Sequence, residues 1–183
     1  MNYKRWIFIA ILLFGIGLIA GLATPTSIAS FISEDINATL KEISSNVVPF
    51  SILTVIFIFV KNASALLISF TFSPILCLLP VLALLLNGWV IAFVSNTVLR
   101  EKSLGFLLAG LLPHGIFEIP AFIIGEAAAL SFGAMFILAL FRRRDGNLLL
   151  SRLKQNLRYL MIAVALLLPA AIIETYVTPL LLI

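Results

Sequence analysis

The sequence has few charged side chains. Only 11% of its 183 residues are Asp, Glu, Lys or Arg, whereas soluble domains carry about 25%. Hydrophobic residues make up 62% of the chain and the mean hydropathy is +1.21. Several apolar runs reach the length of about 20 residues that crosses a bilayer as a helix. The shortage of charge therefore excludes a soluble domain and predicts a polytopic integral membrane protein.

The sequence also lacks the alternating segments of about ten residues that are typical of membrane β-barrels. Its apolar runs are continuous, and inside lipid only helices and closed barrels satisfy every backbone N–H and C=O. The predicted fold is therefore all-α, a transmembrane helix bundle in a single integral membrane domain over residues 1–183. We expect about five spans, a re-entrant half-helix and two amphipathic surface helices.

Cysteine and histidine occur once each. Cys77 can form no disulfide within the chain, and we interpret it as a small core residue in an apolar run. With His114 as the sole histidine, a His-Glu-x-x-His zinc site is excluded, and the chain has no Walker loop and no nucleophile elbow. We therefore expect no enzyme, no cofactor and no metal. The basic residues lack interleaved aromatics, so nucleic acid is not an expected partner.

Four spans are predicted before a basic segment and one after it, over residues 6–23, 50–72, 75–99, 116–140 and 159–183. The amino end is similar to a signal peptide because Lys4 and Arg5 precede an apolar stretch. We interpret that stretch as the first span, since it is long enough to cross and no clear Ala-x-Ala site follows it. A small face for helix packing is supplied by Gly15, Gly17 and Gly21.

Two segments outside these spans are amphipathic. In residues 26–48 aliphatic side chains recur every three or four positions, which predicts a helix on the outer surface. Residues 142–158 begin with three arginines and contain further Lys and Arg, which predicts a cytoplasmic helix on the inner leaflet. An even number of crossings separates this segment from Lys4 and Arg5. We therefore expect the amino end in the cytoplasm and the carboxyl end outside, in the cell (inner) membrane.

The apolar run from Leu104 to Leu140 is too long for one span and too short for two. As a straight helix it would extend about 55 Å, against a hydrocarbon core of about 30 Å. Pro113-His114-Gly115 interrupts the run, so we expect a re-entrant half-helix over 104–112 followed by a span over 116–140. Irregular backbone at membrane depth needs protein or water around it, so His114 should lie in a buried or wet pocket.

Polar side chains within the apolar runs form the candidate site, because such groups usually face a protein interior or a wet cavity. They are Lys61, Asn62, Asn87, His114, Glu118 and Glu126. The residues expected to break or pack the helices are Pro113, Gly115, Pro120, Gly88 and Gly125. Asn87 is expected to hydrogen-bond to a neighbouring helix, which Gly88 would allow to approach closely. Small residues beside Glu118 indicate that it faces another helix rather than lipid.

The role of Lys61 leaves two interpretations open. Either a helix crosses the bilayer with Lys61 near mid-depth and seeking a carboxylate, or the span begins at Asn62 and Lys61 snorkels to the interface.

His114 and Glu118 have three candidate roles. They could form a clasp, with Glu118 paired to Lys61 or bonded to His114 and Asn62, and this is the role that we favour. They could act as a proton relay or substrate contact in a transporter. As metal ligands they would need further partners, of which only Glu126, Glu174 and Asn87 are available.

Three motifs resemble those of a known family. Phe59-x-x-Asn62, Asn87-Gly88, and Pro113 to Ala121 followed by Gly125 are similar to the stage II sporulation protein M family, over about residues 55–183. The positions that the resemblance implies as characteristic are Asn62, Asn87, Gly88, His114, Gly115 and Glu118. In spore-forming bacteria the namesake is a multispanning protein that helps to localise peptidoglycan-degrading enzymes during engulfment. Lys61 is not part of the motif, which weakens a Lys61–Glu118 mechanism.

The expected function follows from these observations together. We expect an integral membrane scaffold or partner subunit of a membrane complex, homo-oligomeric and in contact with lipid and with membrane protein partners. The alternative is a small-solute, proton or ion permease that uses His114 and Glu118.

Overall fold

The regular elements of the chain are helices throughout the described residues. The computed structural model describes residues 3–25, 49–75, 77–142 and 146–182. Its helices are α1 (Tyr3–Leu22), α3 (Ile52–Phe72), α4 (Leu78–Glu101), α5 (Leu104–Arg142), α6 (Gly146–Tyr176) and α7 (Thr178–Leu181). All but the short α7 are long and apolar enough to cross a membrane. The prediction of an all-α chain with five long apolar helices is therefore confirmed. The expected outer segment 26–48 lies outside the described residues.

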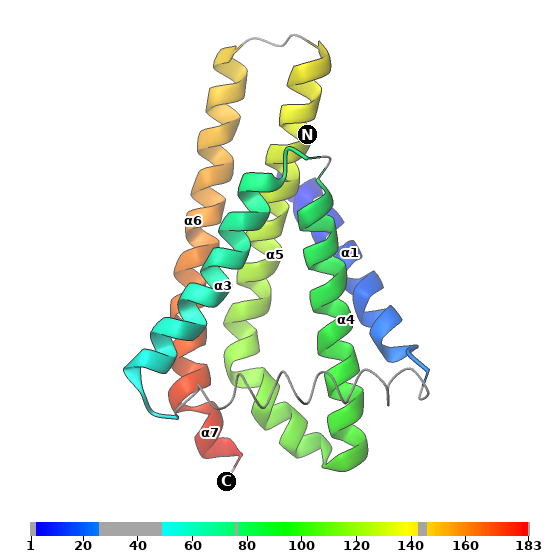
Figure 1. Cartoon of the computed structure of the whole chain (residues 1–183), viewed down its shortest axis with the longest axis vertical. Coiled ribbons are helices and arrows are strands. Elements are labelled where there is room, and N and C mark those ends of the chain that lie inside the picture. Colours follow the sequence, from blue (N-terminus) through cyan, green and yellow to red (C-terminus); the bar gives the residue numbers. More distant parts are fainter. Residues whose placement is uncertain (1–2, 26–48, 76, 143–145, 183) are drawn as a thin grey trace.

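Successive long helices run in opposite directions along the bundle (Figure 1). From the amino end, α1 descends in that view, α3 ascends, α4 descends, α5 ascends and α6 descends. The start of α1 and the end of α5 therefore point toward one end of the molecule, and the carboxyl end lies at the other. This alternation agrees with the even number of crossings expected between the two basic segments.

Local polar groups define where several helices begin. The Ser51 hydroxyl accepts a hydrogen bond from the Leu53 backbone N–H and so caps α3. The Ser103 hydroxyl does the same for the Phe106 N–H at the start of α5, over 3.2 Å. Between α3 and α4 the chain turns through Cys77, whose φ of 55° is left-handed. The connections from α3 to α4 and from α4 to α5 are short, and the helices that they join contact each other.

Helix α5 lies at the centre of the bundle and contacts α1, α3, α4, α6 and α7. Its middle is a block of small buried residues, including Ala121 and Ala127–Ala129, which are fully buried. A Cβ at Gly125 would lie 2.9 Å from Leu66 of α3 and 3.3 Å from Ala163 of α6. Small side chains thus allow three helices to approach one another, as is typical of membrane interfaces.

Helices α1 and α4 form a second close pair that depends on glycine. A Cβ on Gly17 would collide with the Leu85 carbonyl oxygen, and one on Gly88 would collide with that of Phe14. The expected small face of the first span and the expected close approach at Gly88 thus belong to the same contact. Gly15 points away, with no atom within 4 Å of its ideal Cβ position.

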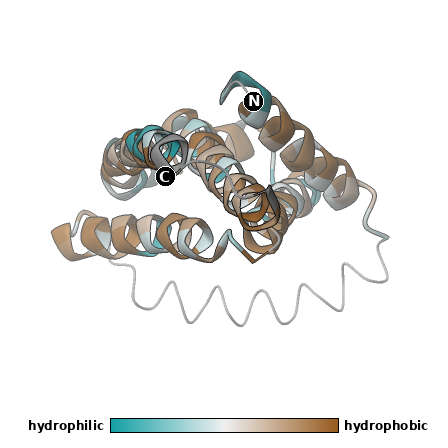
Figure 2. Ribbon diagram, turned by 90° about the horizontal axis from the view of Figure 1, so that it is seen from above, coloured by the Kyte–Doolittle hydropathy of each residue, from teal (hydrophilic) through white to brown (hydrophobic). Residues whose placement is uncertain are grey.

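The outer faces of the bundle are apolar. Large hydrophobic side chains such as Ile19 and Leu53 are about 70% exposed, at 69% and 72%. Figure 2 shows hydrophobic colour over most of the helical surface and hydrophilic colour near the amino end. A surface of this kind is stable in lipid and would be an aggregation liability in water.

The predicted break at Pro113-His114-Gly115 is not present, because α5 is one helix from Leu104 to Arg142 with Pro113 and Pro120 inside it. Its first part runs obliquely from the end of α4, and the helix then bends into the bundle (Figure 1). Proline removes a single N–H and leaves the carbonyl four residues earlier unbonded, so each proline costs a hydrogen bond but need not end the helix. Residues 104–112 therefore continue into the span instead of turning back from it.

The basic segment is likewise not a separate surface helix. Residues from Gly146 onward form the first part of α6, which continues without a break to Tyr176. Together with the end of α5, this part of α6 extends past the amino end of the chain in Figure 1. Residues 143–145 lie outside the described part of the chain.

Candidate functional site

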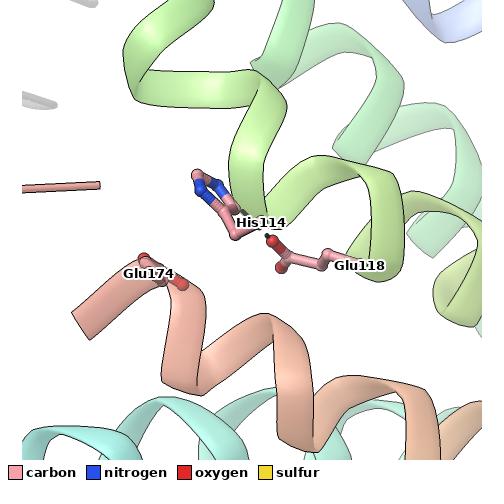
Figure 3. Close-up of side chains that lie close together, drawn as sticks. All are labelled: His114, Glu118 and Glu174. Atoms are coloured by element: carbon pink, nitrogen blue, oxygen red, sulfur yellow. Dashed lines mark ion pairs between the residues drawn. The ribbon is translucent and has the colours of Figure 1, made fainter. Parts of the chain in front are cut away.

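His114 and Glu118 lie one turn apart on the same side of α5, just after its bend. Their Nε2 and Oε2 atoms are 3.8 Å apart, and the two side chains are 13% and 34% exposed. The four-residue spacing brings them together because helical residues at i and i+4 are neighbours on one face. Figure 3 shows both side chains directed into the space between α5 and α6. The predicted pair is therefore formed in a half-buried setting.

Glu174 of α6 joins this pair from across the helix interface (Figure 3). One ligand atom each from His114, Glu118 and Glu174 lie within 4.8 Å of one another. The sequence places Glu174 in the last span and offers it only as one of three possible further metal ligands beside His114 and Glu118. The signal that could have found it is the antiparallel pairing of α5 and α6, which brings residues early in α5 to the level of residues late in α6.

Side chains from two further positions, Asn62 and Thr178, contact the group. Asn62 of α3 donates a hydrogen bond from Nδ2 to Oε1 of Glu118, over 3.0 Å. The His114 Nδ1 lies 3.4 Å from the Thr178 hydroxyl, which itself donates to the Ile173 carbonyl. Since a hydroxyl has one proton, the Thr178 oxygen then accepts from an Nδ1–H, and Nε2 of His114 faces Glu118. The cluster therefore ties α3, α5, α6 and α7 together.

Glu126 forms a separate site, although the sequence placed it in the same constellation. It is 1% exposed and accepts a hydrogen bond from the Ser69 hydroxyl of α3 over 2.5 Å. Eight residues of helix separate it from Glu118, or about 12 Å along the axis. The two glutamates thus have different partners and lie at different levels of the bundle.

Asn87 does not reach a neighbouring helix, so that prediction is wrong. Its side chain is exposed, and Nδ2 donates to the Ala83 carbonyl within α4. The amide is satisfied one turn back on its own helix, so no partner is needed. Its neighbour Gly88 is the residue that turns inward, against Phe14.

Lys61 lies near the middle of α3 and its side chain faces outward. Because α3 runs unbroken from Ile52 to Phe72, the structure favours the interpretation in which Lys61 lies within a span. Among the described residues, no carboxylate lies within ion-pair distance of its ammonium. Glu118 is bonded by Asn62 instead, so the version of the clasp that uses Asn62 and His114 is the one present.

A cavity of about 270 Å³ lies between α4 and the oblique first part of α5. His114 lines one part of it, while most of its wall is apolar and includes Val90, Val94, Phe106 and Leu111. Ser95 contributes the only other polar side chain to this wall. The cavity is therefore an apolar recess that reaches one member of the cluster.

Sequence comparisons place the chain among known proteins. A sequence model described as stage II sporulation protein M matches residues 10–179. An uncharacterized protein of Methanocaldococcus jannaschii is 27% identical over 174 residues, which are 94% of this chain and 93% of that protein. No solved structure matches the chain significantly. Because the family match covers nearly the whole sequence, the chain belongs to the stage II sporulation protein M family.

Proposed function

We propose that the protein is a non-catalytic membrane scaffold, a partner subunit that gathers other membrane proteins, including further copies of itself. The observation that carries the proposal is the hairpin formed by residues 134–142 of α5 and 146–157 of α6, here called the projecting hairpin. Its outer end extends past the other helices in Figure 1, whereas nearer the bundle Leu153 packs against the hydrophobic core and Asn156 is 2% exposed. An element that extends past its own bundle is available to a neighbouring molecule.

The composition of the projecting hairpin supports a docking role. Leu140 and Phe141 are 73% and 78% exposed, and Leu150 is 54% exposed. Lys154, on the same hairpin, is also exposed. Apolar and aromatic side chains surrounded by charged ones are typical of protein interfaces. A surface that faces only water rarely carries several exposed apolar side chains close together.

The polar cluster supports the scaffold more than a conduction pathway. Asn62 of α3 donates to Glu118, and His114, one turn before Glu118 on α5, contacts the Thr178 hydroxyl of α7, so polar contacts link three helices. The recess that reaches His114 is mostly apolar, and an ion pathway needs polar groups or water along its length.

The orientation of the chain is part of the proposal. The start of α1, which carries Lys4 and Arg5, and the projecting hairpin, which carries further Lys and Arg, lie toward the same end of the bundle in Figure 1. Short segments rich in Lys and Arg remain on the cytoplasmic side. We therefore place the projecting hairpin and the amino end in the cytoplasm, with the protein in the cell (inner) membrane.

Site-specific photocrosslinking tests the scaffold. A photoreactive phenylalanine analogue at Phe141 is expected to give discrete adducts in intact membranes, and adducts between two differently tagged copies would identify a second copy as the partner. The same analogue at Ile19, which is 69% exposed on α1, is the control and is expected to yield only lipid adducts. Equal diffuse labelling at both positions would remove the support for docking at the hairpin.

A small-solute, proton or ion permease is the second candidate, because the His114, Glu118 and Glu174 cluster lies within the helices. The Glu118→Gln substitution in liposomes separates the two functions, as it removes the charge and keeps the side chain's shape. A permease predicts proton or metal uptake by the wild type that the variant loses while still assembling. The scaffold predicts no uptake by either protein and weaker stability or partner recovery for the variant.

A further inference from the structure

We propose that His114, Glu118 and Glu174 form a binding site for a divalent first-row transition-metal ion, with zinc as the reference case. The site joins α5 to α6 and goes beyond the scaffold role, on which it does not depend. Imidazole nitrogen and carboxylate oxygen together suit zinc, iron and manganese better than calcium or magnesium, which prefer oxygen ligands alone.

The spacing of the donor atoms fits a single ion. Three potential ligand atoms, one from each residue, lie within 4.8 Å of one another, and Nε2 of His114 is 3.8 Å from Oε2 of Glu118. Two ligands of a tetrahedral zinc ion, each at about 2.1 Å from the metal, lie about 3.4 Å apart. Small side-chain rotations therefore suffice to bring the three atoms around an ion.

The ligands are already oriented by their neighbours. A metal-binding histidine usually donates its other ring N–H to an oxygen, which fixes the tautomer and the ring plane. Here Nδ1 of His114 faces the Thr178 hydroxyl at 3.4 Å, so Nε2 is free for the ion. Asn62 holds Oε1 of Glu118 over 3.0 Å, which leaves Oε2 directed at His114. A purely apolar contact between α5 and α6 would not need this second set of bonds.

The charge of the cluster also favours a cation. Glu118 and Glu174 bring two carboxylates close together inside a membrane bundle, where like charges repel and ionised groups are costly. Lys61 of α3 lies near enough for its charge to act on Glu118 and Glu174, but it faces outward and forms no ion pair with either carboxylate among the described residues. A divalent ion would neutralise both carboxylates, and the partial exposure of Glu118, at 34%, leaves room for water as a further ligand.

Metal binding by the whole protein in detergent micelles tests the site. After metal-free purification, the wild type is titrated with Co²⁺, whose visible absorption reports the coordination geometry, and with Zn²⁺ in competition. We expect one site per chain, displacement of cobalt by zinc and a higher melting temperature with either ion. His114→Gln and Glu174→Gln are expected to weaken affinity about tenfold or more, because each removes a ligand.

The control variant is Glu126→Gln, since Glu126 is a buried carboxylate of α5 outside the cluster. It is expected to bind cobalt like the wild type. No cobalt binding by a folded wild type, or equal losses in Glu126→Gln and Glu174→Gln, would overturn the proposal. Binding of calcium or magnesium in preference to cobalt would also overturn it, because such selectivity leaves no role for the imidazole.

Substitution of a residue that orients a ligand, without itself binding the ion, separates a loss of metal binding from a loss of folding. Thr178→Val preserves the side-chain shape but removes the oxygen beside Nδ1 of His114. We expect about tenfold weaker cobalt affinity and a changed cobalt spectrum, with the metal-free melting temperature close to that of the wild type. An unchanged affinity and spectrum would mean that Thr178 does not orient a ligand, and the proposed geometry would fail.

Discussion

Glu118 and Glu126 lie on the same helix but have different surroundings. Glu126 is 1% exposed and has Ser69 as its single polar partner. Glu118 is partly exposed and faces Asn62, His114 and Glu174. A carboxyl that has one hydrogen-bond partner and no exposed surface serves to join two helices. A carboxyl among several polar groups can exchange hydrogen-bond partners or bind a ligand. The functional candidate is therefore Glu118, and Glu126 is a structural contact between α3 and α5.

This assignment predicts a loss of stability when the partner of Glu126 is removed. Ser69→Ala leaves a fully buried carboxyl without its hydrogen bond, which should lower the free energy of unfolding by about 1–2 kcal/mol. The measurement is thermal or denaturant unfolding in detergent. Thr71→Ala, at an exposed hydroxyl of the same helix that bonds only to the Leu67 carbonyl, is the control and should change stability by less than about 0.5 kcal/mol. Equal effects of the two substitutions would contradict the assignment.

At the scale of the helices, close contacts depend on small residues. On α1, Gly17 lies against the backbone of α4 at Leu85, while Gly15 two residues earlier has open space beside it. Transmembrane helices gain little from the hydrophobic effect once they are in lipid, so close van der Waals packing supports their association. The two glycines of one helix should therefore respond in opposite ways to the same substitution.

Gly17→Ala is expected to destabilise the α1–α4 pair by about 1–3 kcal/mol, because the added methyl group meets backbone that cannot rotate away. Gly15→Ala should leave stability unchanged or raise it by about 0.5–1 kcal/mol through helix propensity. Limited proteolysis and thermal unfolding of both variants would measure the difference. A Gly15→Ala protein as unstable as Gly17→Ala would show that glycine acts here through the backbone and not through contact.

At the scale of the whole molecule, the projecting hairpin marks where the membrane should end. Five long apolar helices require lipid around the bundle, yet the end of α5 and the start of α6 extend past the amino end of the chain (Figure 1). Arg142 closes α5, and Lys154 is exposed on the first part of α6. Charged groups at that end are stable only in water or among headgroups.

Cysteine labelling checks this placement. In a Cys77→Ser background, Phe141→Cys should react with a membrane-impermeant maleimide in inverted vesicles but not in intact cells, because the hairpin is expected in the cytoplasm. Ile11→Cys, in the middle of α1 and 52% exposed, should react in neither preparation because lipid surrounds it. Labelling of residue 141 in intact cells would reverse the proposed orientation. Labelling at residue 11 would contradict the assignment of α1 as a span.

Much of the architecture follows from local sequence. The apolar runs and the positions of the basic residues predict five helices and their alternating directions, because a long apolar run must cross lipid as a helix and basic residues remain on the cytoplasmic side. The pairing of His114 with Glu118 is also local, since it needs only helical geometry. The break expected at Pro113 was wrong because a proline's lost hydrogen bond is tolerated when the surrounding helices hold both halves of α5 in place.

The sequence by itself determined that this chain is an all-helical membrane protein with its polar side chains concentrated near His114. Only the tertiary structure decided that Glu174 joins His114 and Glu118, that Glu126 pairs with Ser69, and that Asn87 turns back on its own helix. The reason is physical. Length and hydropathy fix where a helix lies in lipid, but its rotation and its neighbours depend on how small residues such as Gly17, Gly88 and Gly125 let helices pack.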